Sequence, residues 1–116
     1  MTASFRASVL TIFPEMFPGP LGHSLTGKAL EAGIWSLDPR NLRDFATDRH
    51  RSVDDVPFGG GAGMVMRADV IDRAVEAVHP RADARPLIYV SPKGARFDHA
   101  MAQSLADGPG CVILCG

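Results

Sequence analysis

Two short stretches in the second half of the sequence constrain the fold most, because each is apolar throughout. They are residues 86–90 (PLIYV) and 111–115 (CVILC), and a segment with helical spacing, about residues 98–105, separates them. Strands without polar alternation are typical of parallel sheets, in which both faces are covered. The pattern therefore predicts a β-α-β unit with a right-handed crossover, and an α/β fold for the chain.

The N-terminal stretch carries a period-two pattern that predicts another strand, ended by Pro14. Residues 14–17 can begin a helical turn, and residues 18–23 have the composition of a loop. One face of this predicted strand carries Phe5, Ala7, Val9 and Thr11.

Ser24 is a suitable cap for a helix that runs to about Ala32 and stops at Gly33. Residues 34–37 are compatible with a short strand. Residues 38–68 show little periodicity, and a loop of this length inside a compact domain is usually functional or disordered.

A second helix is predicted to begin at Asp69 as its cap, and residues 79–86 form the connection that follows it. The third helix begins at Asp98. The apolar stripe that defines the second helix consists of Val70, Ile71, Ala74, Val75 and Val78.

The composition suits one globular domain and excludes several other classes of protein. The 116 residues are 46% hydrophobic and 22% charged, and their net charge is −1. This apolar share is too high for a disordered chain, and the net charge is not that of a strongly basic nucleic-acid binder. No run of about 18 apolar residues and no signal peptide is present, so we expect no membrane segment and a cytoplasmic location.

The cysteines indicate neither a disulfide nor a metal site. Cys111 and Cys115 lie within an apolar run, where they behave as small hydrophobic residues. Cytoplasmic chains rarely carry structural disulfides, and no further ligands stand at metal-binding spacing. We therefore expect no metal.

Two segments in the middle of the chain could carry chemistry. Arginines and aspartates alternate from Asp38 to Asp55, a pattern typical of a solvated face, although arginine also pairs with phosphate. The string GGGAGM, residues 59–64, is typical of a surface loop, but its bare backbone could also cradle a phosphate or a flat base. It matches neither the dinucleotide fingerprint nor the P-loop.

The string YVSPKG, residues 89–94, stands at the carboxyl end of a predicted parallel strand. In open α/β sheets, ligands bind beyond this edge, so the backbone from Tyr89 to Pro92 could contact a nucleoside-like ligand. The same letters are also typical of a turn after a strand.

These segments together resemble one enzyme family, in the right order and over nearly the whole length. The chain is similar to the N-terminal half of the bacterial tRNA guanine-N-1 methyltransferases of the SPOUT, or trefoil-knot, class. The resemblance implies a mostly parallel sheet with flanking helices and an incomplete knot. The segments that carry it are FPEMF (13–17), DRHRSVDD (48–55), PFGGGAGM (57–64), YVSPKG (89–94) and LCG (114–116).

The resemblance also implies an activity. Members of this family transfer a methyl group from S-adenosylmethionine to ring nitrogen 1 of the guanosine on the 3′ side of the tRNA anticodon, which maintains the reading frame. They are homodimers whose active sites use both subunits. We therefore expect S-adenosylmethionine as methyl donor, with tRNA and a second copy of the chain as partners.

Matching the motifs position by position implies two sets of binding residues. The residues implied to contact the methyl donor are Tyr89, Val90, Ser91, Pro92 and Gly116. The residues implied to hold the target guanosine are His50, Asp54, Gly59 and Gly63. The catalytic arginine and aspartate of the family match no residue here, so no catalytic residue is assigned.

The expected chemistry agrees with these residue types. Methylation of a ring nitrogen requires removal of its proton and stabilisation of negative charge on the neighbouring oxygen. A flipped guanine needs a close slot, which glycines permit.

The chain departs from the family pattern in composition and in length. Phe58 stands where tyrosine is usual, Ala62 where proline is usual, and Lys93 where glutamine is common. In that family the sequence continues past Leu-Cys-Gly into the rest of the knot and a C-terminal tRNA-binding domain, which we expect to lie outside these residues. Residues 1–116 are therefore expected to be the N-terminal part of the methyltransferase domain, and to be inactive alone.

Two other functions stay open. The arginines and the glycine string could serve a non-catalytic RNA-binding or dimerisation module, or a small nucleotide-binding domain with phosphate at the glycine string. Binding of S-adenosylmethionine distinguishes the enzyme from an RNA module, and a steep salt dependence indicates phosphate contacts.

Overall fold

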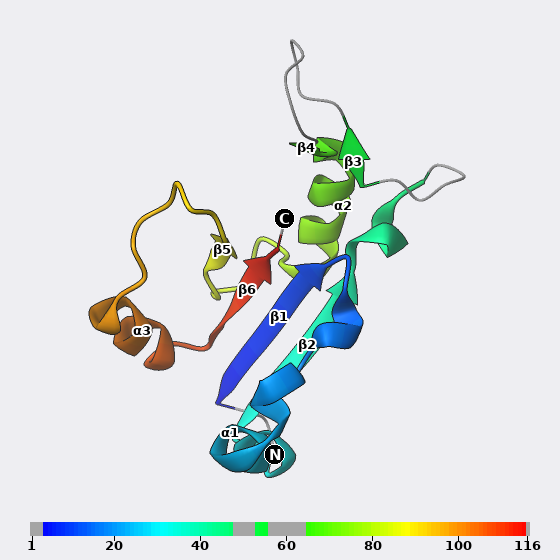
Figure 1. Cartoon of the computed structure of the whole chain (residues 1–116). Coiled ribbons are helices and arrows are strands. Elements are labelled where there is room, and N and C mark those ends of the chain that lie inside the picture. The colour runs from blue at the N-terminus through cyan, green and yellow to red at the C-terminus, as the bar shows by residue number, and fades with distance from the viewer. Residues whose placement is uncertain (1–3, 48–52, 56–64, 116) are drawn as a thin grey trace.

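The structure, a computed structural model, describes residues 4–47, 53–55 and 65–115. Its centre is a four-stranded sheet in the order β2-β1-β6-β5, in which all neighbouring strands are parallel. Helices flank this sheet (Figure 1). The predicted α/β fold with a mostly parallel sheet is therefore confirmed, while the knot stays a prediction.

Strands, helices and short 3-10 turns follow one another along the described chain. The strands are β1 (Phe5–Thr11), β2 (Trp35–Asn41), β3 (Asp54–Asp55), β4 (Val65–Met66), β5 (Leu87–Tyr89) and β6 (Gly110–Leu114). The helices are α1 (Ser24–Glu31), α2 (Ala68–Val78) and α3 (His99–Ala106). The 3-10 turns are η1 (Pro14–Met16), η2 (Gly19–Gly22) and η3 (Leu42–Phe45). β3 and β4 form a separate antiparallel pair.

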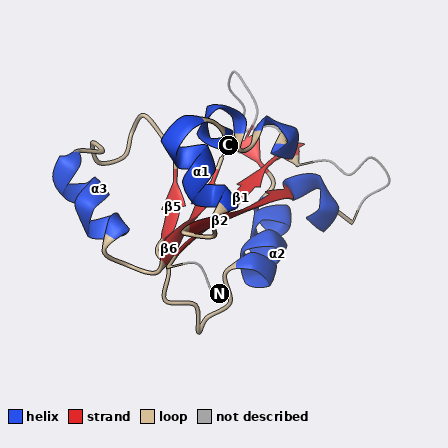
Figure 2. Ribbon diagram, turned by 90° about the horizontal axis from the view of Figure 1, so that it is seen from below, coloured by secondary structure: helices blue, strands red, loops and turns tan. Residues whose placement is uncertain are grey.

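β1 lies inside the sheet, between β2 and β6. Its position and its end before Pro14 agree with the prediction. All residues from Ala7 to Thr11 are buried, whereas a period-two pattern is typical of a strand with one exposed face. Both faces of this strand are covered because the sheet packs against elements on both sides, and Figure 2 shows α1 and α2 on opposite sides of it.

The hydrophobic core lies between the sheet and α2. Leu10 of β1 and Val112 of β6 pack with Val70 and Ala74 of α2, and all four are almost completely buried. Leu42 of η3 joins the same core. The apolar stripe predicted for the second helix is therefore confirmed, because its side chains form the face that covers the sheet.

The starts of α2 and α3 differ in how their first turns are held. α3 begins at His99, one residue after the predicted start, because Asp98 is its cap: the Asp98 side chain accepts a hydrogen bond of 2.9 Å from the backbone of Met101. The predicted cap of α2 is wrong: Arg67 occupies that position, and Asp69 lies within the first turn. There Asp69 pairs with Arg67 and Arg73, and its charge suits the positive end of the helix.

The end of α1 was predicted correctly and its start was not. Gly33 has a φ of +77°, its N–H donates to Leu30, and the N–H of Ile34 donates to Ala29, which is a Schellman motif. Ser24 is not the cap, because His23 holds that position. Ser24 itself has a φ of +57°, which is costly for a residue with a Cβ.

The second strand is longer than predicted, because β2 runs to Asn41 rather than ending near residue 37. It pairs with β1 along its full length, from Phe5 with Trp35 to Thr11 with Asn41. The strand lies at an edge of the sheet, which permits Pro39 within it. This pairing is a tertiary effect that the local pattern does not reveal.

The prediction that residues 86–90 form a strand buried on both faces is wrong. β5 contains only Leu87, Ile88 and Tyr89, with Leu87 44% and Tyr89 60% exposed. It lies at the second edge of the sheet and pairs with β6 alone among the described strands. The apolar run therefore marks a strand that stands open on one side, whereas β6 is buried as predicted.

Gly110 allows β6 to begin directly against β1. Its φ of +135° is a conformation that side chains rarely adopt, and a Cβ there would overlap the carbonyl oxygen of Arg6. The chain is held at this point because the N–H of Arg6 donates to the carbonyl of Pro109 at 3.0 Å. Glycine is therefore required for the pairing of β1 with β6.

A buried ion pair joins the connection after α2 to the sheet. The Arg85 guanidinium donates to the Asp83 carboxylate at 2.7 Å and to the Ser8 hydroxyl at 2.9 Å, and Arg85 is only 6% exposed. Hydrogen bonds from Arg85 hold the pKa of the Asp83 carboxyl far below its usual value of 3.8. The connection is therefore an ordered part of the core.

We expect Gly110→Ala to lower the free energy of unfolding by about 3 kcal/mol or more, because it combines a forbidden φ with a backbone overlap. Gly33→Ala is the matched control. It also has a positive φ, but its Cβ would meet open space, so about 1 kcal/mol is expected. Equal losses in denaturant unfolding of the two variants would contradict the proposed overlap.

We expect the Asp83–Arg85 pair to make stability depend on pH. Because the pKa of Asp83 is lowered by folding, its contribution is complete above the unfolded pKa and is lost as the pH falls below it. Asp83→Asn should cost about 3 kcal/mol near neutral pH. When the pH is lowered from about 6 to about 3, the unfolding free energy of the Asp83→Asn variant should also fall less than that of the unmodified protein. Parallel pH curves for the two proteins would disprove this role.

Candidate functional site

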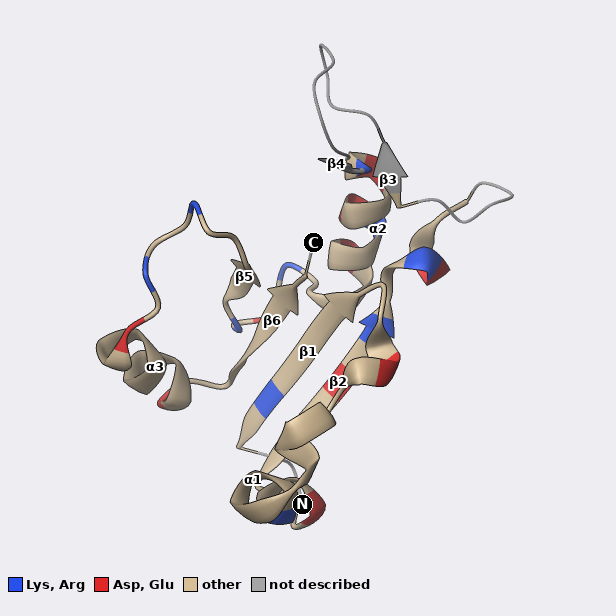
Figure 3. Cartoon of the chain, viewed as in Figure 1, with Lys and Arg blue, Asp and Glu red and all other residues tan. Residues whose placement is uncertain are grey.

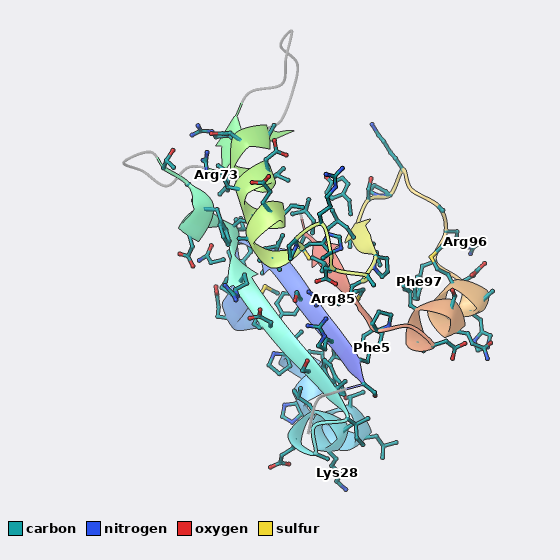
Figure 4. The ribbon with its side chains drawn as sticks, turned by 180° about the vertical axis from the view of Figure 1, so that it is seen from behind. Phe5, Lys28, Arg73, Arg85, Arg96 and Phe97 are labelled. Carbon is teal, nitrogen blue, oxygen red and sulfur yellow. The ribbon has the colours of Figure 1, made fainter. Side chains whose placement is uncertain are left out.

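A cavity of about 1100 Å³ lies beside β5, between the sheet and the connection that leads into α3. Figure 4 shows Arg96 and Phe97 on this connection. The four described residues that are predicted to contact the methyl donor all line the cavity: Tyr89, Val90, Ser91 and Pro92. Tyr89 ends β5, and the other three follow it directly.

The floor of the cavity is the face of the sheet that α2 does not cover. Cys111 and Ile113 of β6 line it, whereas Val112 and Leu114 belong to the core beneath α2. Successive residues of a strand point to opposite faces, so the sheet separates the core from the cavity. On the far side, α3 contributes Met101 and three further residues: Ala102, Leu105 and Ala106.

A tight turn follows β5 at the rim of the cavity. The N–H of Gly94 donates to the carbonyl of Ser91 at 3.3 Å, and the N–H of Lys93 donates to the Ser91 hydroxyl at 3.2 Å. Pro92 occupies the second position of this turn, which its fixed φ favours. The sequence reading of Ser-Pro-x-Gly as a turn is therefore confirmed.

The backbone of Tyr89 faces away from the rest of the sheet. The N–H of Val112 donates to the carbonyl of Pro86, and the N–H of Val90 donates to the carbonyl of Leu114. Since backbone groups of a strand alternate in direction, those of Tyr89 lie on the opposite edge. Such an edge offers a donor and an acceptor to a ligand or to another strand.

The cavity wall is mainly apolar. Phe97 and Met101 are exposed to it, and Phe5 closes one side. The charged member of its lining is Arg96, for which no hydrogen-bond or ion-pair partner is found among the described residues. An apolar pocket with a few convergent polar groups is the usual form of a small-molecule site.

The residues predicted to hold guanosine lie mostly outside the described part of the chain. His50, Gly59 and Gly63 fall there, as does Gly116 of the predicted donor site. Asp54 begins β3, whose backbone lies opposite Met66 of β4. Figure 1 shows β3 and β4 beyond the carboxyl ends of β1 and β6, at the end of the molecule where β5 also stops.

Arg40, in the described part of the arginine run, has a local acidic partner. Arg40 contacts both oxygens of Asp38 at 3.0 and 3.1 Å, and both side chains are about half exposed. Arg73 donates to the carbonyl of Phe45 at 2.7 Å, which ties α2 to η3. Figure 3 shows basic and acidic residues side by side on these elements, as in the predicted mixed-charge face.

Thiols and other metal-binding side chains do not form a centre in the described ranges. No group of three His, Cys, Asp or Glu residues there could hold a metal ion. Cys111 lies on the cavity floor, and burial raises the pKa of its thiol. Within the same ranges, no helix combines the length and the apolar character needed to cross a bilayer.

Sequence reasoning missed the α3 side of the cavity and the Arg85–Asp83 pair. α3 is short and, among its described side chains, none is buried. The spacing of its apolar residues therefore did not indicate that it forms a cavity wall. Arg85 stands in a stretch that reads as a polar connection, and Ser8 lies 77 residues away. No local pattern predicts such a partner.

Comparisons with known proteins place the chain in a family. The family model described as "tRNA (Guanine-1)-methyltransferase TrmD" matches residues 5–116. Proteins named tRNA (guanine-N(1)-)-methyltransferase from Mesorhizobium japonicum and Gluconobacter oxydans are 61% and 59% identical over 97% of this chain. The matched region is 49% and 48% of those proteins.

A protein of the same name from Rhodospirillum rubrum is 59% identical over 97% of the chain, which is 46% of its own length. The chain thus spans about half the length of the curated relatives it matches. Because the family model covers nearly every residue, the chain belongs to the tRNA (guanine-1)-methyltransferase family.

Proposed function

We propose that the complete protein carrying this chain methylates ring nitrogen 1 of a guanosine in tRNA, with S-adenosylmethionine as donor. The guanosine is the one on the 3′ side of the anticodon, and its methylation maintains the reading frame. The observation that carries the proposal is the cavity beside β5, whose lining includes Tyr89 to Pro92, in a chain of this family.

The residues present fit such a donor. S-adenosylmethionine supplies an electrophilic methyl group on a sulfonium, next to a nucleoside and an amino-acid portion. The cavity offers apolar walls for the flat base, and the free edge of Tyr89 offers an N–H and a carbonyl to its polar groups. Arg96 carries the charge that would suit a carboxylate.

The guanosine is assigned to the segments around Asp54, together with His50, Gly59 and Gly63. A carboxylate accepts hydrogen bonds from the N–H groups of a guanine edge, so Asp54 would orient the base. Removal of the N1 proton needs a general base, and we assign that role to no described residue. The 116 residues alone are therefore proposed to be inactive.

The proposal includes a second copy of the chain, which the family resemblance implies, and a cytoplasmic location, which is the expectation from the sequence. Residues 1–116 would form the N-terminal part of the methyltransferase domain. The open edge of β5 and the exposed cavity wall support an arrangement in which further protein surrounds the site.

We expect Ala102→Trp in the full-length protein to weaken binding of S-adenosylmethionine at least about tenfold, because the added ring fills the cavity. Ala100→Trp is the matched control, since Ala100 is an exposed residue of the same helix that does not line the cavity. Titration calorimetry measures both affinities.

If both variants bind S-adenosylmethionine as the unmodified protein does, the donor does not occupy this cavity. If the unmodified protein binds tRNA but no S-adenosylmethionine, the non-catalytic RNA-binding module is the better description. In that case the tRNA affinity should fall steeply as the salt concentration rises.

We expect Asp54→Ala in the full-length protein to lower kcat for tRNA methylation about a hundredfold, because the base would lose its orienting acceptor. Asp55→Ala removes the neighbouring carboxylate of β3 and should have a much smaller effect. Methyl transfer to a tRNA transcript gives both rates. Unchanged turnover in Asp54→Ala would remove Asp54 from the site.

A further inference from the structure

We propose that Arg85 is a positioning residue for the methyl-donor site. It does not line the cavity, but it holds the start of β5, so that the backbone from Tyr89 to Pro92 is presented in one place. This inference rests on the proposed function, because it assigns the donor to that backbone. It adds a residue that the family motifs around the site do not include.

Arg85 is held from three directions. Its Nε contacts both carboxylate oxygens of Asp83 at 3.1 Å, and Nη2 contacts one of them at 2.7 Å. Its Nη1 donates to the Ser8 hydroxyl of β1 at 2.9 Å and lies 3.4 Å from the carbonyl of Arg6. Its Nη2 also lies 3.4 Å from the carbonyl of Val78. One side chain thus joins the end of α2 and β1 to the segment that leads into β5.

The backbone of Arg85 is held as well. Its N–H donates to the Asp83 carboxylate at 3.0 Å, and its carbonyl accepts from the His79 ring. The next residue, Pro86, accepts a hydrogen bond of 2.9 Å from Val112 of β6. The start of β5 is therefore located by side-chain and backbone contacts together. Figure 4 shows Arg85 beside the strands, well separated from Arg73 on α2.

β5 depends on this anchor because it has little else to hold it. It is three residues long and, among the described strands, pairs only with β6. Two of its three side chains are exposed. At its far end, the bond from Val90 to Leu114 is 3.3 Å, which is longer than the bond to Pro86. A displacement of the Arg85 backbone is therefore transmitted to the backbone of Tyr89, because only three residues separate them.

The choice of arginine at this position is explained by positioning rather than by stability. Buried ion pairs are often no more stabilising than apolar packing of the same volume, so stability does not by itself explain the choice of residue. The guanidinium fork, in contrast, fixes direction as well as distance, because its N–H groups are rigidly arranged. Lysine at this position would keep the charge and lose the fork.

The test compares Arg85→Lys with the unmodified full-length protein in steady-state methylation of tRNA. A loosened β5 must be ordered when the donor binds, so we expect the KM for S-adenosylmethionine to rise about tenfold. We expect kcat and the KM for tRNA to change less than about twofold at saturating donor. Ser8→Ala removes a single hydrogen bond to Arg85 and should raise the KM for S-adenosylmethionine by about threefold. This second variant provides the test if Arg85→Lys does not fold.

Arg73→Lys is the matched control. Arg73 also bridges two elements, through Asp69 and the carbonyl of Phe45, but it does so at η3 rather than at β5. It should lower the melting temperature without changing the KM for S-adenosylmethionine. If Arg85→Lys and Ser8→Ala likewise leave that KM unchanged, Arg85 has only a structural role and the inference is wrong.

Hydrogen exchange separates this inference from the proposed function. Without any donor, the amide of Val90 should exchange faster in Arg85→Lys, while the amides of β1 should change little. A protein that binds no S-adenosylmethionine disproves the proposed function, whatever the exchange shows. Unchanged exchange at Val90 in a protein that does bind the donor disproves the role of Arg85 alone.

Discussion

The parallel pairing of β6 with both β1 and β5 brings the carboxyl ends of three strands together. The register places Leu114 beside both Leu10 and Tyr89, so the carboxyl ends of three strands lie side by side. The segments that follow β1 and β5, and Cys115 after β6, therefore begin close together. The pairing depends on a close approach at the opposite end, where only glycine fits between β6 and β1. Ligand sites of open parallel sheets lie beyond the carboxyl ends of the strands. Tyr89 to Pro92 line the cavity at that end, and the cavity floor extends from there along the face of the sheet.

The two faces of the sheet differ in a way that suits a binding protein. Beneath α2, the core is closed, with Leu10, Val70 and Val112 almost fully buried. On the other face, Ile113 forms part of the floor of the apolar cavity and α3 forms one of its walls. The same strands thus have a closely packed face beneath α2, which can position the backbone of β5, and an open face, where that backbone can contact a ligand. The Arg85–Asp83 pair belongs to the closely packed face, where its burial keeps water from competing for its hydrogen bonds.

Much of the fold could be predicted from the sequence, because it follows from local periodicity. The stripe of α2, the apolar run of β6, the start of α3 near Asp98 and the stop at Gly33 each depend on neighbouring residues. The errors concern features that depend on distant partners. The length of β2 comes from pairing with β1, and the exposure of β5 comes from its place at the edge of the sheet. For the site, the rule for parallel strands led to Tyr89–Pro92, and the four residues share one cavity. The wall contributed by α3 and the anchor at Arg85 required the structure, because neither has a sequence signature.

The central claim is that the backbone after β5 holds the nucleoside of the methyl donor. A crystal structure of the full-length protein with S-adenosylhomocysteine tests it most directly, since this product keeps the nucleoside and lacks only the transferred methyl group. The account predicts ring and ribose atoms within hydrogen-bond distance of backbone groups from Tyr89 to Pro92, with the base inside the apolar cavity. A nucleoside bound elsewhere, with the cavity filled by protein side chains, would contradict it.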